Sequence, residues 1–139
     1  EKVNSYDCEK SGFEIQGLQK SKVFHGRCIK DIVIHSINPH EERSGHYHDY
    51  KTEWFMALCG EAKLIWSEKI NSEEADLKTE VLKADFDNPY ILEVQLKTCH
   101  WVRNNIKEVF VMASFSSEEF NPQVPDNPKC RRNIQSIKS

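Results

Sequence analysis

Four side chains of this sequence have the types and spacing of a metal-binding or acid–base site. His46 and His48 are separated by one residue, Glu53 follows five residues later, and His100 lies in a distant segment. Alternate residues of an extended strand point to the same side, so both imidazoles would face one interior. Three imidazole nitrogens and one carboxylate oxygen suit a divalent first-row metal, with positions left for water or substrate. We therefore expect His46, His48, Glu53 and His100 to bind a divalent ion (Zn, Mn, Fe or Ni).

Two simpler interpretations remain open for these residues. In the first, the segment is an exposed hairpin whose imidazoles have no chemical role. In the second, no metal is bound and His46 or His48 itself acts as a general base. If both imidazoles bind metal, their lone pairs are committed and another side chain must move the proton. The catalytic candidates are Tyr50, Lys51 and His35.

Arg43 and Tyr90 are the candidates for substrate binding. The Arg43 guanidinium can hold a phosphate through two hydrogen bonds and lies just before the histidines, although an ordinary solvated charge beside Glu41 and Glu42 is an equal alternative. Tyr47 is out of phase with the two histidines and is expected to pack. The tryptophans are expected mostly in the core.

The elements that must position these residues are predicted to be strands. Short segments rich in β-branched and aromatic residues alternate with turn-forming pieces, which indicates an all-β sandwich or barrel. A helix or a polar hairpin loop is expected at 71–79. The predicted strands are 13–15, 29–37, 52–58, 62–66, 80–82, 89–96 and 108–115.

The chain is sized for one folded domain. It has 139 residues, 38% of them hydrophobic, and a formal net charge of -3, which disfavours a nucleic-acid partner. We expect a domain over 6–117 and an extended arm over 118–139, because Pro122, Pro125 and Pro128 fall within seven residues. Such an arm packs on a neighbouring subunit or over a pocket mouth, or is a loose terminus.

The five cysteines are scattered, odd in number and without a C-x-x-C pair. They predict no disulfide framework, a reducing cytoplasmic location, and Cys59 and Cys99 as buried small hydrophobes. No apolar run approaches the length of a membrane span, so no membrane partner is expected.

The segment 43–60 resembles the first cupin motif, with His46-x-His48, Glu53 and Gly60 at family spacing, and His100 with Asn104 resembles the core of the second. The run from Arg43 to His48 is similar to small cupins of capsular and surface polysaccharide biosynthesis, including nucleotide-deoxysugar epimerases and ketoisomerases. Val124-Pro125-Asp126 is similar to the tail of such proteins.

The resemblance implies an all-β, single-domain cupin jelly-roll β-barrel, commonly a homodimer, that acts on a nucleotide-linked keto-sugar as an epimerase or ketoisomerase. Two alternatives stay open. One is a non-catalytic cupin that binds a sugar or metal as a sensor or partner subunit. The other is a metal-dependent dioxygenase, because three histidines and one glutamate also serve oxygen chemistry.

Overall fold

The structure is a computed structural model that describes residues 29–70 and 77–130, and these residues form strands, turns and loops without a helix. Short apolar and β-branched runs separated by turns produce the strands, as expected from the sequence. The strands are β1 (Asp31–Ile37), β2 (Glu42–His46), β3 (Glu53–Cys59), β4 (Glu61–Ser67), β5 (Lys78–Lys83), β6 (Leu92–Val94), β7 (Cys99–Arg103) and β8 (Phe110–Ser116).

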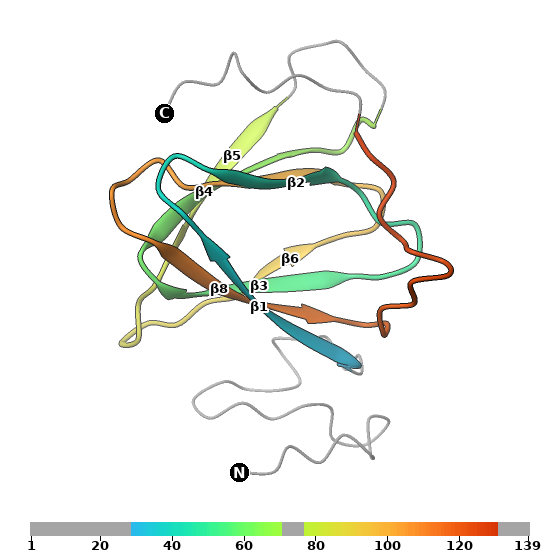
Figure 1. Ribbon diagram of the computed structural model, residues 1–139, viewed down its shortest axis with the longest axis horizontal. Coiled ribbons are helices and arrows are strands. Elements are labelled where there is room, and N and C mark those ends of the chain that lie inside the picture. Colours follow the sequence, from blue (N-terminus) through green and yellow to red (C-terminus); the bar gives the residue numbers. More distant parts are fainter. Residues whose placement is uncertain (1–28, 71–76, 131–139) are drawn as a thin grey trace.

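The strands form two facing four-stranded antiparallel sheets (Figure 1). One sheet has the order β1-β8-β3-β6 and the other β2-β7-β4-β5. Consecutive strands therefore alternate between the sheets through much of the chain, which is the arrangement of a jelly roll. The two edge strands of each sheet have a hydrogen-bonded neighbour in that sheet on one side only. The sandwich therefore has two open sides: β1 and β2 border one, and β5 and β6 border the other.

Alternation along the strands divides buried residues between the two faces of each sheet. Phe55, Leu64, Val102 and Met112 belong to the main core between the sheets. Their neighbours in sequence form smaller clusters, with Trp54 beside Phe115, and Trp101 beside Ile65, Cys99 and Tyr47. The expected packing role of Tyr47 is confirmed.

Six predicted strands fall in the described residues, and each overlaps an observed strand, although only 62–66 and 80–82 lie wholly inside one. Residues 89–96 contain only the short strand β6, because Tyr90 and its neighbours form the loop that leads into it. The predicted helix at 71–79 is wrong where it can be compared, since Lys78 and Thr79 begin β5 and pair with Trp66 and Ile65. The rest of that segment, and the strand expected at 13–15, lie outside the described residues.

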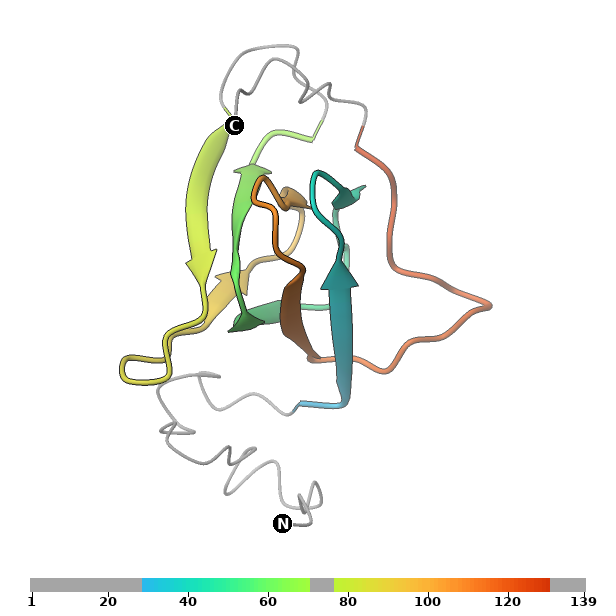
Figure 2. The ribbon, with the colours of Figure 1, turned by 60° about the vertical axis from the view of Figure 1, so that its left-hand side comes forward.

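Beyond β8 the chain runs along one side of the sandwich, from the end of β8 to the level of β2 (Figure 1 and Figure 2). Within 117–130 its regular pairing is a single bridge, between Lys129 and His46. We call residues 117–130 the arm. The domain limits at 6–117 and 118–139 stay predictions.

The prediction that no disulfide forms is wrong, because Cys99 of β7 is bonded to Cys130 of the arm. The two residues are 31 apart in sequence and carry no spacing signal; the arm brings them together. Closing a loop of this size stabilises a fold by roughly 3–4 kcal/mol in the chain-entropy account. Cys59 was also misplaced: it ends β3 at a register shift and is exposed.

Within 29–70 and 77–130 no helical segment has the length and hydrophobicity needed to cross a membrane.

Candidate functional site

The four predicted metal-binding residues meet at one end of the space between the sheets. His46 closes β2 and pairs directly with His100 of β7, which places their ring centroids 4.8 Å apart. His48 follows two residues later, with its ring 4.7 Å from that of His46. Glu53 opens β3 in the opposite sheet. The nitrogen and oxygen donor atoms of the four side chains all lie within 4.8 Å of one another.

Gly45 sets the direction in which the chain enters the site. Its φ of 94° lies in the left-handed region, and the register between β2 and β7 shifts at this point. A Cβ atom on Gly45 would lie 2.7 Å from Nε1 of Trp101. Glycine therefore permits both the backbone bend and the close approach of the Trp101 ring just before His46.

Two of the imidazoles are oriented by backbone carbonyls. His48 Nδ1 donates to the carbonyl oxygen of Asp126, and His100 Nδ1 donates to that of Thr98 over 3.0 Å. Since a carbonyl can only accept, each Nδ1 carries the hydrogen, and each Nε2 is left with a lone pair unless the ring is doubly protonated. Imidazoles that bind metals are held in this way.

The Glu53 carboxylate is divided between a structural contact and the site. Its Oε2 accepts a hydrogen bond of 2.8 Å from the Ser114 hydroxyl. Its Oε1 contacts His48 Nε2 and lies 3.7 Å from His100 Nε2. These three facing atoms are fully buried, and none has a regular hydrogen-bond partner. Either a proton on His48 or a cation must join them, because facing lone pairs repel each other.

The electrostatics of the cluster favour neutral His46 and His100 rings beside an ionised Glu53 carboxylate. Burial, followed by the neighbouring His100 and His48 rings, lowers the pKa of His46 to about 3. Burial also lowers the pKa of His100. Burial alone would raise the pKa of Glu53, yet the contact with His48 and the charges of His48, His100 and Lys51 lower it below its usual range. Neutral imidazole and ionised carboxylate are the forms that bind a divalent cation.

A cavity of about 480 Å³ opens in front of this cluster. This volume is within the range of sites for small organic ligands. Its floor is apolar, from Ile37, Phe55, Val102 and Met112, and its polar lining includes His46, His48 and Glu53. The cavity lies on the side of the sandwich bordered by β1 and β2.

The structure brings three of the other candidates to this cavity. His35, Arg43 and Lys51 all line it. Arg43 Nη1 donates to His35 Nδ1 over 3.1 Å, so the hydrogen of a neutral His35 ring is on Nε2. Burial, followed by the positive charge of Arg43, lowers the pKa of His35.

The two tyrosine candidates lie elsewhere. Tyr50 is 74% exposed and does not line the cavity. The Tyr90 hydroxyl donates to the Val81 carbonyl over 2.9 Å and accepts from the Lys83 N–H, so it fastens the loop before β6 to β5. Neither tyrosine is brought beside the histidine cluster.

Three supporting residues were not predicted from the sequence as site residues. Ser114 holds Glu53, while the Thr98 and Asp126 carbonyls hold two imidazoles. Only Ser114 left a usable signal, as a polar residue in the apolar strand β8. A backbone carbonyl belongs to every residue, so its use in orienting a ring leaves no mark on the sequence.

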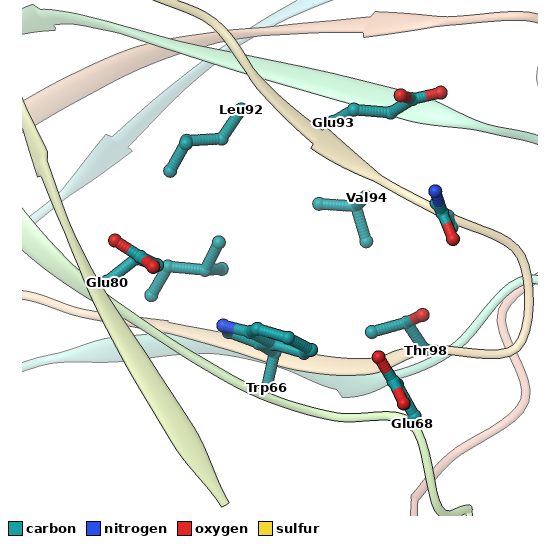
Figure 3. Close-up of a pocket in the computed structure, with 9 residues that line it drawn as sticks. Trp66, Glu68, Glu80, Leu92, Glu93, Val94 and Thr98 are labelled. Atoms are coloured by element: carbon teal, nitrogen blue, oxygen red, sulfur yellow. The ribbon is translucent and has the colours of Figure 1, made fainter.

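A second cavity, of about 380 Å³, lies toward the other open side of the sandwich and is lined by residues of β4, β5 and β6 (Figure 3). Trp66, Leu92 and Val94 provide its apolar surface, and Glu68 and Glu80 lie at its border. It contains no histidine or cysteine.

Three comparisons relate the chain to known proteins. Residues 21–128 match the family described as "Polysaccharide biosynthesis C-terminal domain". No curated protein matched the chain. The fold is similar to the capsular polysaccharide assembling protein CapF of Staphylococcus aureus, with a TM-score of 0.62, 16% identity, and coverage of 71% of this chain. The chain spans 26% of the CapF chain.

Two similar structures are closer in length to this chain. QdtA, a sugar 3,4-ketoisomerase of Thermoanaerobacterium thermosaccharolyticum in complex with TDP, has a TM-score of 0.60 and 16% identity over 83% of this chain and 74% of QdtA. The WlaRB TDP-quinovose 3,4-ketoisomerase of Campylobacter jejuni has a TM-score of 0.61 and 13% identity over 84% and 79%.

These comparisons and the strand order confirm the predicted cupin jelly roll and the resemblance to proteins of polysaccharide biosynthesis. The family match covers most of the sequence, including all eight strands and the four clustered site residues. The chain belongs to the polysaccharide biosynthesis C-terminal domain family.

Proposed function

We propose that this chain is a metal-dependent cupin that acts on a nucleotide-linked keto-sugar, as an epimerase or ketoisomerase of surface polysaccharide biosynthesis. The observation that carries the proposal is the convergence of His48 Nε2, His100 Nε2 and Glu53 Oε1 beside His46, buried and without regular hydrogen-bond partners. The family match and the similar fold of two sugar ketoisomerases support the substrate class.

His46, His48, Glu53 and His100 would hold the ion. When bound, a divalent ion supplies Lewis-acid polarisation of a ketone oxygen. The donor set suits Zn²⁺, Mn²⁺, Fe²⁺ or Ni²⁺, because it combines imidazole nitrogen with one carboxylate oxygen. Ser114 and the Thr98 carbonyl keep the donor atoms directed at the centre.

The reaction requires a base for the carbon-bound proton beside the ketone. The proton leaves this carbon and the bonding electron pair moves toward the ketone oxygen, giving an enolate. An epimerase returns a proton to the same carbon on its other face. A ketoisomerase instead delivers a proton to the former ketone carbon, while the hydroxyl on the neighbouring carbon gives up its proton to become the new ketone and the former ketone oxygen takes one up.

His35 is the side chain best placed to move that proton. It lines the cavity, is not one of the four clustered donors, and its lowered pKa keeps it neutral at pH 7. Arg43 is positioned to bind the diphosphate of a nucleotide sugar, and by turning toward it would free the lone pair of His35 Nδ1. Lys51, also at the cavity, would add positive charge near the substrate.

Deuterium exchange tests the proposal directly. The protein is loaded with Mn²⁺ or Zn²⁺ without oxygen and incubated in deuterated water with TDP-4-keto-6-deoxyglucose, the sugar nucleotide bound in another QdtA structure. We expect deuterium to enter the carbon next to the ketone, and His35→Asn to slow this at least tenfold. His40→Asn is the matched control, because His40 is exposed and does not line the cavity.

Two results would contradict this assignment. Binding of the sugar nucleotide without any exchange would favour a non-catalytic sugar-binding cupin. Oxygen consumption that depends on substrate and metal would favour a dioxygenase. A homodimer also stays a prediction, to be tested by light scattering of the eluted protein.

A further inference from the structure

The arm adds backbone pairing to the edge of the sheet that carries two of the histidines. Tyr47 N–H donates to the Pro128 carbonyl over 3.0 Å, and Cys130 N–H donates to the Gly45 carbonyl over 2.7 Å. The bridge between His46 and Lys129 lies between these bonds. β2 would otherwise be a free edge of its sheet, so the arm completes its hydrogen bonding beside the site.

Asp126 makes the densest set of contacts between the arm and the site. Its carboxylate accepts hydrogen bonds from the backbone N–H groups of Asp49, Tyr50 and Lys51, at 2.7, 2.8 and 2.9 Å. Its own carbonyl accepts from His48 Nδ1. One arm residue therefore fixes both the chain that follows His48 and the orientation of its ring.

The disulfide fastens this arrangement covalently. Cys130 lies four residues after Asp126, and its partner Cys99 immediately precedes His100 in β7. Cys99 is fully buried, whereas Cys130 is half-buried. The same short stretch of chain thus connects the supports of two imidazoles of the cluster.

We propose that the arm is a redox-sensitive part of the metal centre, in which Asp126 is a positioning residue for His48 and the Cys99–Cys130 disulfide keeps Asp126 in place. The inference rests on the proposed metal centre. A dithiol would break the sulfur–sulfur bond, giving two electrons and two protons to Cys99 and Cys130 and becoming a disulfide itself. The reduced arm is held by non-covalent contacts only, and we expect weaker metal binding.

The first test concerns Asp126. Asp126→Asn replaces the carboxylate that accepts hydrogen bonds from the backbone N–H groups after His48. Asp87→Asn, in the exposed loop before β6, is its matched control. Zn²⁺ affinity is measured by competition with a chromophoric chelator. Loss of a residue that supports a metal-binding histidine typically weakens affinity about 10–100-fold, and we expect this for Asp126→Asn only.

The second readout needs no metal. Nitrogen-15 NMR of the imidazole rings reports which nitrogen of His48 carries hydrogen in the metal-free protein. We expect Nδ1–H in the wild type and in Asp87→Asn, and a mixture of tautomers in Asp126→Asn. An unchanged His48 ring together with a Zn²⁺ affinity within twofold of wild type would overturn the role of Asp126.

The third test concerns the disulfide. Cys99→Ser/Cys130→Ser removes it without adding a thiolate ligand, and Cys59→Ser is the control because Cys59 is free and exposed. We expect about tenfold weaker Zn²⁺ binding in the double variant alone. If that variant fails to fold, oxidised wild type is compared with wild type reduced by a phosphine. The disulfide takes two electrons from the phosphine, and water supplies the oxygen of the phosphine oxide and the protons of the two thiols. Equal affinities in either comparison would overturn the redox part.

Failure of the proposed metal centre is distinguishable from failure of this inference. A wild-type protein that binds none of the four candidate ions would contradict the metal centre. The His48 tautomer would still show whether Asp126 orients the ring.

Discussion

Two cavities of the sandwich, the histidine cavity and the one beside Trp66, differ little in volume and greatly in chemistry. Both have apolar floors, at about 480 Å³ for the histidine cavity and about 380 Å³ for the one beside Trp66. In the first, buried donor atoms from both sheets face one another without regular partners. Beside the second, the Lys78 ammonium group lies 4.6 Å from the Trp66 ring centroid and 4.0 Å from a Glu68 carboxylate oxygen, so this cation meets an aromatic face and an opposite charge.

The difference shows that the convergence of unsatisfied donor atoms, rather than cavity volume, identifies the candidate reactive centre. Burying three facing lone pairs is costly unless a cation or proton is bound between them. Among the described residues, no buried polar atom that lacks a hydrogen-bond partner belongs to the lining of the Trp66 cavity, whose side chains are shown in Figure 3.

The largest expected effect is the loss of metal binding from one cavity and not the other. His48→Ala removes a donor that lies at the centre of the cluster, and we expect Zn²⁺ affinity to fall more than about 100-fold. Glu80→Gln, in the Trp66 cavity, should leave the affinity within twofold. Equal losses in the two variants, measured by chelator competition, would abolish the distinction between the cavities.

Acid should destabilise the metal-free protein through the histidine cavity. The pKa of His46 is lowered to about 3 in the folded protein. Below about pH 6.5 the unfolded chain therefore binds a proton at His46, whereas the folded chain does not. The free energy of unfolding should therefore decrease as pH falls from 6.5 toward 3, by at most about 1.4 kcal/mol per pH unit for each such group. Urea denaturation with chelator at pH 7 and pH 5 measures the slope. His46→Asn should reduce it, and an unchanged slope would contradict the assignment to His46.

Ser114→Ala tests whether the site depends on its support from the opposite sheet. The variant removes the 2.8 Å hydrogen bond to Glu53 Oε2, which leaves the carboxylate free to turn. We expect roughly tenfold weaker Zn²⁺ binding. Ser36→Ala, on the exposed part of β1, is the control. The Zn²⁺ affinities are measured by titrating the metal-free proteins. Equal affinities of Ser114→Ala and Ser36→Ala would refute this role.

The smallest effect is expected in the Trp66 cavity. Lys78→Ala removes the ammonium group from the Trp66 ring and should lower the free energy of unfolding by about 0.5–1 kcal/mol. Metal affinity should not change. A metal affinity that fell with this variant would show that the cavities are coupled.

The fold was largely predictable because its signals are local. Alternation of apolar residues produced most of the strand positions, and the spacing of His46, His48 and Glu53 pointed to a single site. The segment at 71–79 misled because polar and charged residues precede the start of β5 at Lys78. Tyr90 was predicted to bind substrate from its residue type alone. Its hydroxyl instead bonds to the backbone of β5, which only the packed structure brings close to it.

The cysteines show the limit of spacing arguments most clearly. Nothing near Cys99 or Cys130 indicates pairing, since the two are brought together by the return of the arm to β2. Asp126 shows the same limit. Its position in the sequence suggested a tail, whereas its contacts in the structure place it against His48.

By itself the sequence determined the residue types of the candidate centre and the all-β class, because composition and period-2 alternation act between near neighbours. Only the tertiary structure decided which nitrogen of each imidazole faces inward, that Ser114 supports Glu53, and that the arm is bonded beside His100. These features depend on hydrogen bonds between residues far apart in the chain, whose distances and directions are set when the two sheets and the arm pack together.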